Sequence, residues 1–481
     1  MNWEDFIDIR LNYQNNLPRL VTDQTGVLYS SVYLLWLANK KVDVKITDRF
    51  LEIRPLVDYD KQVLIITTKE DIPTYILNKV EHTVFSYSDL PLNGDIHKAF
   101  KNIEPKQIIE ILDYVFATNQ HQVLLANDLE NVLVKAKQFT STKQLLVLTE
   151  QIKEIILQQA NTNNVLNLAK LWAELVYLSY KNGNAEYQSL IPQIDAFSDD
   201  FINSNGMKQA FYASTDRKPK TVDKILANIK ADKQEKTALV CFDCMGYAEW
   251  YLLKEFLSKQ NWKFEDTAVF TLLPSLTSIS RSAIFQGNTD VYNLKYPGRK
   301  TEAKAFANYF NNKETKYFTE DDEITSDTIL GYEYISLLYN FFDELSHSAQ
   351  FPPNNESKDL YFQSLLAYLE KSTVIQDLQT LIENDFQIYI CSDHGSVVAK
   401  GNGNRIEKYL SDDFAKRGVI VNKENGELIS ERKINIPFVE DKILVLPEGR
   451  TMFANKNQIE VNHGGTTVEE MVVPYIKMTK V

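Results

Sequence analysis

Five short fragments in the second half of the sequence carry carboxylate, imidazole and hydroxyl groups that could bind metal ions. These groups belong to Asp243, Thr277, Asp343, His347, Asp393, His394 and His463. All three histidines of this half fall in these fragments, each with a carboxylate or a glycine close by in the sequence. Three carboxylates, three imidazoles and one hydroxyl are enough to bind two divalent cations with a nucleophile between them.

Most of these fragments, taken alone, also have a simpler interpretation. An aspartate that ends a strand, such as Asp243, is often the N-cap of the following helix. Asp343 and His347 are four residues apart on a predicted helix, so both side chains project from one face, which is also a common surface arrangement. His463 lies in a glycine-rich loop, where histidines usually contact only solvent. The joint occurrence of the fragments favours the metal site.

The strongest single fragment is Asp393-His394-Gly395. Two different ligand types stand side by side at a predicted strand end, and we expect the glycine to permit an unusual backbone conformation. Cys241 and Cys244 form a C-x-x-C pair that invites a zinc or redox interpretation. The chain has no second pair, and Cys391 is the only other thiol. We therefore expect the cysteines to be buried in the core.

Composition and charge limit the classes of function. The chain has 481 residues, of which 44% are hydrophobic, and a formal net charge of −13. This charge argues against non-specific coating of nucleic acid, which requires many basic side chains, although a local basic groove stays possible. Three cysteines are typical of a reducing compartment. Because we find no signal peptide and no apolar run near the roughly 18 residues of a membrane span, we expect a cytoplasmic protein without membrane contact.

Hydrophobic patterning predicts three regions: 1–120, 121–235 and 236–481. The first is expected to be an α/β domain, with short strands at 42–47, 62–67 and 83–87. Residues 105–195 have the spacing of helices, and the lysine-rich segment 201–236 is predicted to link the two halves. The N-terminal half carries no convincing catalytic set of residues, so we expect it to be an interaction module.

The second half alternates strands and helices. Strands are predicted at 238–242, 267–271, 387–391, 419–421, 442–446 and 471–476, and helices at 247–259, 332–347 and 358–383, with a further helix after Thr277. This alternation predicts a mostly parallel sheet flanked by helices. Ligands gather at the carboxyl ends of such strands, and Asp243 and Asp393 each follow a predicted strand directly.

The order of these residues resembles the alkaline phosphatase-like superfamily. The segments around Asp243 and Thr277, and the sequence His463-Gly-Gly-Thr-Thr-Val-Glu-Glu-Met-Val-Val-Pro474, resemble its PglZ branch over residues 237–481. The resemblance implies an alkaline phosphatase-like core and a phosphodiesterase or nuclease-like activity in a bacterial phage-defence (BREX-type) system. Since the N-terminal half does not look like a receiver domain, the defence form is favoured over the response-regulator form. The N-terminal half is then expected to contact other defence subunits.

Carried over residue by residue, the resemblance implies a ligand set for each of two metals. One set is Asp343, His347 and His463, and the other is Asp243, Asp393, His394 and the Thr277 oxygen. Imidazole and carboxylate ligands favour Zn²⁺, and Mn²⁺ is the alternative. Thr277 is the implied nucleophile, which would form a phosphothreonine. Arg281, one helical turn later, is expected to contact a metal ligand or the substrate phosphate, or else to be an ordinary exposed arginine.

Two other functions remain open at this point. The chain could be a phosphomonoesterase or phosphotransferase that acts on a small metabolite, or a scaffold whose metal site stabilises the fold. A positive groove beside the site would favour a nucleic acid or oligonucleotide substrate. Such a groove could come from four basic residues, although a solvated surface segment is the simpler interpretation: Lys295, Arg299, Lys300 and Lys304.

Overall fold

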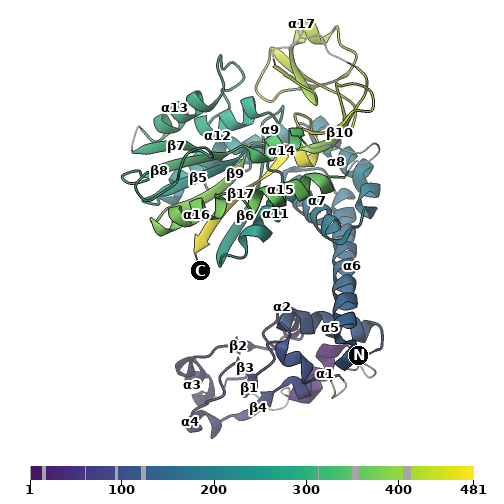
Figure 1. Ribbon diagram of the computed structural model, residues 1–481, viewed down its shortest axis with the longest axis vertical. Helices are drawn as coiled ribbons and strands as arrows, with labels where there is room; N and C mark the ends of the chain where they lie inside the picture. Colours follow the sequence, from purple (N-terminus) through teal and green to yellow (C-terminus); the bar gives the residue numbers. More distant parts are fainter. Residues whose placement is uncertain are drawn as a thin grey trace. The chain divides into compact units, whose positions relative to one another are not determined.

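The chain folds as two units, Met1–Leu146 and Val147–Val481, which we describe separately (Figure 1). The structure is a computed structural model and describes residues 2–12, 18–59, 61–92, 96–120, 126–311, 314–348, 357–404 and 413–480. Helix α6 (Leu129–Ile156) runs through the division between the units. The sequence instead suggested boundaries near residues 120 and 235.

The first unit contains a four-stranded parallel sheet in the order β2-β3-β1-β4. Its elements are α1 (Trp3–Leu11), β1 (Arg19–Asp23), α2 (Ser31–Asn39), β2 (Val44–Ile46), α3 (Phe50–Asp58), β3 (Leu64–Thr67), α4 (Thr74–Leu77), β4 (Glu81–Phe85) and α5 (Pro105–Ala117). The three strands predicted here correspond to β2, β3 and β4. Strand β1 is missing from the prediction because only two of its five residues are apolar.

The second unit begins with a helical region that packs on its large sheet. This region contains α7 (Thr162–Asn182), α8 (Ile191–Asn203), α9 (Gly206–Ala213) and α10 (Ile225–Asp232). The rings of Phe201 and Phe270 stack with centroids 5.1 Å apart, and Thr221 forms a β-bridge with Phe270. Residues 201–236 are therefore not the linking segment that their lysine content suggested. Val222 and Leu226 are buried at helical spacing, whereas several of the lysines are exposed.

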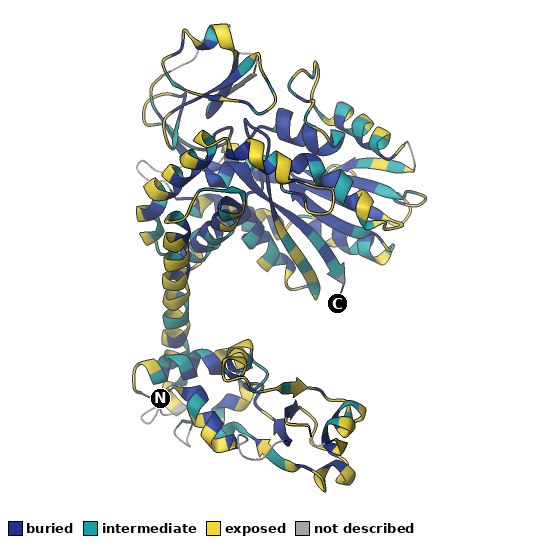
Figure 2. Ribbon diagram, turned by 180° about the vertical axis from the view of Figure 1, so that it is seen from behind, coloured by how far each residue is buried: buried dark blue, intermediate teal, exposed yellow. Residues whose placement is uncertain are grey.

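The large sheet has the strand order β6-β17-β9-β5-β8-β7. The strands are β5 (Thr237–Phe242), β6 (Trp262–Phe270), β7 (Thr315–Thr319), β8 (Tyr334–Tyr339), β9 (Gln387–Ser392) and β17 (Val472–Lys480). Strands β9, β5, β8 and β7 are parallel, and β17 is antiparallel to both of its neighbours. The central strands are largely buried (Figure 2). This arrangement confirms the predicted mixed α/β fold with a parallel-rich sheet.

Helices flank this sheet (Figure 1). They are α11 (Tyr247–Leu257), α12 (Ser282–Gln286), α13 (Arg299–Tyr309), α14 (Phe341–Ser348), α15 (Asp359–Leu369) and α16 (Val374–Glu383). The single helix predicted over 332–347 is wrong, because β8 occupies its first half and α14 only its second. The run from Ile335 to Leu338 is buried on both faces, Ser336 included, so it suits a central parallel strand, which is covered on both sides.

A smaller β-rich region lies between β9 and β17. It contains a sheet of β15 (Thr451–Met452), β10 (Val397–Gly401) and β16 (Ile459–Asn462), and a sheet of β11 (Asp413–Ala415), β12 (Gly418–Asn422), β14 (Lys442–Leu446) and β13 (Arg432–Asn435), with α17 (Lys423–Gly426) and α18 (Val468–Met471). The strands predicted at 419–421, 442–446 and 471–476 correspond to β12, β14 and β17. His463 directly follows β16.

The described helices include none that combines the length and the apolarity needed to cross a bilayer.

Candidate metal centre

Three buried side chains form the inner cluster: Asp243, Asp393 and His394. Strands β5 and β9 are neighbours, and Phe242 pairs with Ser392. The residues that follow these strands, Asp243 and Asp393, therefore meet at the carboxyl edge of the sheet. One ligand atom from each of the three residues lies within 4.8 Å of the others. The structure thus brings together the inner residues that the sequence predicted.

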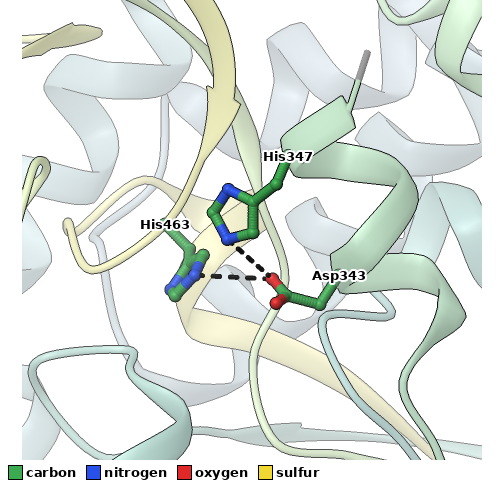
Figure 3. Close-up of side chains that lie close together, drawn as sticks. All are labelled: Asp343, His347 and His463. Carbon is green, nitrogen blue, oxygen red and sulfur yellow. Dashed lines mark ion pairs between the residues drawn. The ribbon is translucent and has the colours of Figure 1, made fainter.

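A second, more exposed group forms the outer cluster: Asp343, His347 and His463 (Figure 3). Asp343 and His347 project from one face of α14, and Asp343 Oδ1 lies 3.4 Å from His347 Nε2. His463 approaches from the loop after β16, with Nε2 3.6 Å from the same oxygen. The His347 side chain is 51% exposed and the His463 side chain 13%. This cluster therefore opens to solvent, unlike the inner one.

The two clusters are adjacent, and one histidine of each stacks on the other. The rings of His394 and His463 are 4.0 Å apart between centroids, with an angle of 19° between their planes. His394 Nδ1 lies 3.2 Å from the Gly395 carbonyl oxygen, and His463 Nδ1 lies 3.3 Å from the Ser275 carbonyl oxygen. Donation from Nδ1 to these carbonyls leaves Nε2 of each ring facing the carboxylates as an acceptor, which is the state required of a metal ligand.

Thr277 lies beside the inner cluster. Its Oγ1 is 2.9 Å from His394 Nε2 and 3.3 Å from Asp243 Oδ1. The residue begins one π-helical turn (Thr277–Arg281) that continues into α12. Such turns are rare and are frequent at functional sites. Thr277 as a residue is only partly buried, and the cluster holds its hydroxyl.

Arg281 is buried rather than exposed, and its side chain reaches back to the inner cluster. Its Nη1 lies 2.6 Å from Asp243 Oδ2, and its Nε lies 3.0 Å from Glu302 Oε1. The interpretation of an ordinary exposed helix arginine is therefore wrong, and contact with a ligand residue is what the structure has. Burial alone would lower the pKa of Arg281, but the surrounding carboxylates raise it, Asp243 most strongly.

Sequence reasoning missed the residues that hold the His463 loop. The Ser275 hydroxyl accepts from the Gly464 amide at 3.2 Å and donates to the Gly465 carbonyl at 3.1 Å. Glu470 accepts from the Gly465 amide at 2.8 Å and forms a buried ion pair with Arg417 at 2.7 Å. The capping-box pattern Thr-x-x-Glu before the last strand is the signal that could have found Glu470.

Burial shifts the protonation of the inner residues and of His463. It raises the pKa of the Asp393 carboxyl well above its usual range, and the Asp243 charge adds to this. It lowers the pKa of His394, and together with His394 it lowers the pKa of His463 to about 4. Both histidines are therefore neutral at pH 7, as metal ligands must be.

Two ligand oxygens lack hydrogen-bond partners. Asp343 Oδ1 and Asp393 Oδ2 are both buried, and neither accepts a hydrogen bond. A buried carboxylate oxygen without a partner is costly unless a cation compensates it. Two Asp/His clusters, each with a buried oxygen that accepts no hydrogen bond, therefore fit divalent metal ions.

Gly395 is required for close packing, not for an unusual backbone conformation as the sequence suggested. Its φ is not positive, and a Cβ at this position would lie 2.0 Å from the Glu469 carbonyl oxygen. The segment after His394 thereby lies directly against the segment that follows His463. Only a residue without a side chain allows this approach.

The cysteines and the basic segment follow their simpler interpretations. Cys241, Cys244 and Cys391 are free and buried, and Cys241 pairs with Cys391 across the sheet. The hydrogen bond between these two thiols and burial raise the pKa of Cys241, which makes it unreactive. The four basic residues of segment 295–304 are exposed on and before α13: Lys295, Arg299, Lys300 and Lys304.

Comparison with known proteins identifies the domain that carries both clusters. The family model described as the BREX system PglZ alkaline phosphatase-like domain matches residues 221–478, more than half of the chain. No curated protein matches the chain. The start of the match at Thr221 coincides with the β-bridge between Thr221 and Phe270.

Several solved structures are similar to the chain at low identity. Murine ectonucleotide pyrophosphatase/phosphodiesterase 5 is 10% identical over 50% of this chain and 88% of that chain, with a TM-score of 0.36. The human protein of the same name is 11% identical over 50% and 87%, with a TM-score of 0.33. Phosphonoacetate hydrolase from Sinorhizobium meliloti 1021, in complex with phosphonoacetate, is 11% identical over 51% and 90%, with a TM-score of 0.30.

The match includes all of the residues in both ligand clusters and Thr277. An alkaline phosphatase-like domain is a hydrolase domain of the phosphoester type. The chain belongs to the PglZ family of alkaline phosphatase-like domains.

Proposed function

We propose that the protein is a metal-dependent phosphodiesterase of a BREX-type phage-defence system, with Thr277 as its nucleophile. The observation that carries this proposal is the position of Thr277 Oγ1, 2.9 Å from His394 Nε2 and 3.3 Å from Asp243 Oδ1. The hydroxyl of a partly buried threonine held against a ligand cluster is an arrangement suited to covalent catalysis.

Two metal ions are proposed to complete the site. Asp243, Asp393, His394 and Thr277 would hold one, and Asp343, His347 and His463 the other. The mixture of imidazole and carboxylate ligands favours Zn²⁺, with Mn²⁺ as the alternative. When bound, two such ions would lower the pKa of the Thr277 hydroxyl and stabilise the charge on the attacking and leaving oxygens.

The protein's own residues position the reacting hydroxyl. The Thr277 hydroxyl lies between two acceptors, His394 Nε2 at 2.9 Å and Asp243 Oδ1 at 3.3 Å, which share its one proton, and the π-helical turn fixes the backbone behind it. In the first step, Oγ1 loses its proton and forms a bond to phosphorus, the bond from phosphorus to the leaving oxygen breaks, and the proton ends on that oxygen, which leaves as an alcohol and gives a phosphothreonine. In the second step, water attacks phosphorus, the bond to Oγ1 breaks, a proton from the water returns to Oγ1, and a phosphomonoester is released.

The charge around the centre favours a diester over a monoester. Among the residues that the structure describes, Arg281 is the cation paired with the inner cluster, and its charge is taken up by Asp243 and Glu302. A phosphodiester carries one negative charge and a monoester about two, so the diester places less demand on protein cations. An oligonucleotide is one possible diester, and the acidic chain as a whole favours a short substrate over a long duplex.

The first unit is proposed to contact other subunits of the defence system. The possible metal-binding groups found among the described residues all lie in the second unit. A role in association rather than in chemistry is therefore the simplest function for Met1–Leu146.

The experiment that tests the proposed function is Thr277→Ala with a chromogenic diester, bis-p-nitrophenyl phosphate. The substitution removes the attacking oxygen and leaves the three inner ligands in place, so turnover should fall by about 10⁴-fold or more while metal is retained. Thr277→Ser should keep partial activity, since only the β-methyl group that restricts the rotamer is lost.

Two results would contradict the proposal. One is near-normal diesterase turnover by Thr277→Ala. The other is a strong preference of the wild type for p-nitrophenyl phosphate, which would favour a phosphomonoesterase.

A further inference from the structure

A chain of three side chains, two of them buried and the third, Tyr317, half-buried, extends from the inner cluster. Arg281 Nη1 contacts Asp243 Oδ2 at 2.6 Å, Arg281 Nε contacts Glu302 Oε1 at 3.0 Å, and the Tyr317 hydroxyl donates to Glu302 Oε2 at 2.8 Å. The side chain of Arg281 is 8% exposed and that of Glu302 only 2%. Neither residue is one of the metal ligands described above.

Glu302 stands out because of the helix that carries it. Helix α13 has the sequence Arg-Lys-Thr-Glu-Ala-Lys-Ala-Phe-Ala-Asn-Tyr, and its basic residues Arg299, Lys300 and Lys304 are exposed. Glu302 is instead turned inward, toward Arg281. A carboxylate is almost never fully buried unless it is paired, so this burial needs a specific reason.

The two carboxylate oxygens of Asp243 have different contacts. Oδ2 is taken by Arg281, whereas Oδ1 faces Thr277 and lies 3.6 Å from His394 Nε2. Arg281 therefore holds the carboxylate so that one defined oxygen faces the centre. The same π-helical turn supplies both Thr277 and Arg281, so the nucleophile and the residue that orients its neighbour are fixed together.

The negative charge of Glu302 explains its role beside Arg281. An arginine beside Asp243 would oppose the binding of a dication, because like charges repel most strongly where water is excluded. Glu302 offsets the arginine charge at Nε, whereas Asp243 contacts Nη1, and Tyr317 fixes the Glu302 carboxylate through its second oxygen. Arg281 can then orient Asp243 with a smaller loss of the attraction that draws a cation to the cluster.

We infer that Glu302, fixed by Tyr317, is a positioning residue that acts through Arg281 to set the metal affinity of the inner cluster. This inference rests on the proposed two-metal centre. It predicts that Glu302→Gln, which keeps the shape and removes the charge, weakens the inner site by about 10- to 100-fold, the range found for partners of metal ligands. Tyr317→Phe should have a smaller effect in the same direction.

The second unit offers a matched control. Tyr339, on the neighbouring strand β8, donates to the buried carboxylate of Asp377 at 2.6 Å, in the same kind of pair as Tyr317 and Glu302. Asp377 is not a member of either ligand cluster. Asp377→Asn therefore removes a comparable buried charge and should leave the affinity of the inner site unchanged.

The experiment is a zinc titration of the metal-stripped, full-length protein against a chromophoric chelator, with the inner site identified as the one lost in Asp393→Asn. Only variants whose thermal unfolding temperature matches that of the wild type are compared. Excess zinc should restore the activity of Glu302→Gln, because its defect lies in affinity. In an Arg281→Gln background, Glu302→Gln should change the affinity by less than about twofold, because the residue through which it acts is gone.

Three results would overturn the inference. They are an unchanged inner affinity in Glu302→Gln, an equal loss in Asp377→Asn, and a full Glu302→Gln effect that persists without Arg281. A wild-type chain that binds neither Zn²⁺ nor Mn²⁺ at the inner cluster would overturn the proposed function as well, so the two failures are distinguishable.

Discussion

The inner and outer clusters use similar ligands in opposite surroundings. Asp393 and His394 are fully buried, and the inner carboxylates follow strands whose register is fixed by the sheet. The outer cluster joins one face of α14 to a loop, and its His347 side chain is 51% exposed. An ion at the inner cluster would be shielded from water, whereas an ion at the outer cluster would remain open to water and substrate.

This difference suggests a division of labour within the proposed mechanism. The buried cluster lies against Thr277 and carries the arginine that orients Asp243. The open cluster, where the His347 side chain is 51% exposed, is where water that attacks a phosphothreonine would enter. Attack and hydrolysis would thus depend on different parts of the same centre. We therefore expect the two clusters to differ in metal affinity, and we expect substitutions in them to lower turnover to different extents.

The largest expected effect comes from removing one ligand from each cluster. Asp393→Asn should lower the metal affinity of the inner site by more than about 100-fold and abolish most turnover. Even the loss of a residue that only contacts a metal ligand lowers metal affinity by about 10- to 100-fold. His347→Ala should weaken only the outer site and leave one ion bound, since this ligand is half exposed. Elemental analysis after dialysis measures both. Loss of both ions in His347→Ala, or two ions in Asp393→Asn, would contradict the comparison.

Glu470→Gln is expected to lower metal affinity less than these substitutions do and also to lower the stability of the fold. This buried carboxylate pairs with Arg417 and holds the Gly465 amide, two residues from His463. Removal of one partner of a buried ion pair costs about 3–5 kcal/mol of unfolding free energy. The outer site should lose affinity and the inner site should not. Denaturant unfolding and zinc titration give the two quantities.

The stabilisation by Glu470 has a defined pH dependence. Arg417 and the hydrogen bonds to Glu470 outweigh its burial and hold its pKa below the ordinary value of 4.5. The unfolded state therefore takes up the proton first as pH falls, and the stabilisation is complete above pH 4.5 and is lost below it. The difference in unfolding free energy between the wild type and Glu470→Gln should therefore shrink below pH 4.5. Glu460→Gln is the control, because its partly exposed pair with Lys416 should contribute less than about 1 kcal/mol.

The sequence was sufficient for the parts of the site that follow strands. Asp243 and Asp393 could be predicted because each ends a buried apolar run, and parallel strands bring such ends to one edge. Helical spacing was enough to place Asp343 and His347 on one face. The apolar run that forms β8 was misassigned to a helix, because short apolar runs have the same pattern in a buried strand and a buried helix.

The supporting residues could not be predicted in the same way. Glu302 lies in a polar helix whose pattern indicates a solvated surface, and its burial depends on an arginine 21 residues away. Arg417 reaches Glu470 across 53 residues of chain. Such pairs exist only once the tertiary structure is formed, and no local pattern reports them.

The most direct test of the two-cluster centre is the anomalous scattering of crystals grown with Zn²⁺ and measured at the zinc edge. Two peaks about 4 Å apart are expected. One should lie among Asp243, Asp393, His394 and Thr277 Oγ1, and the other, with lower occupancy after brief exposure to chelator, among Asp343, His347 and His463. A single peak bound jointly by both clusters, or zinc bound only elsewhere on the protein, would contradict it.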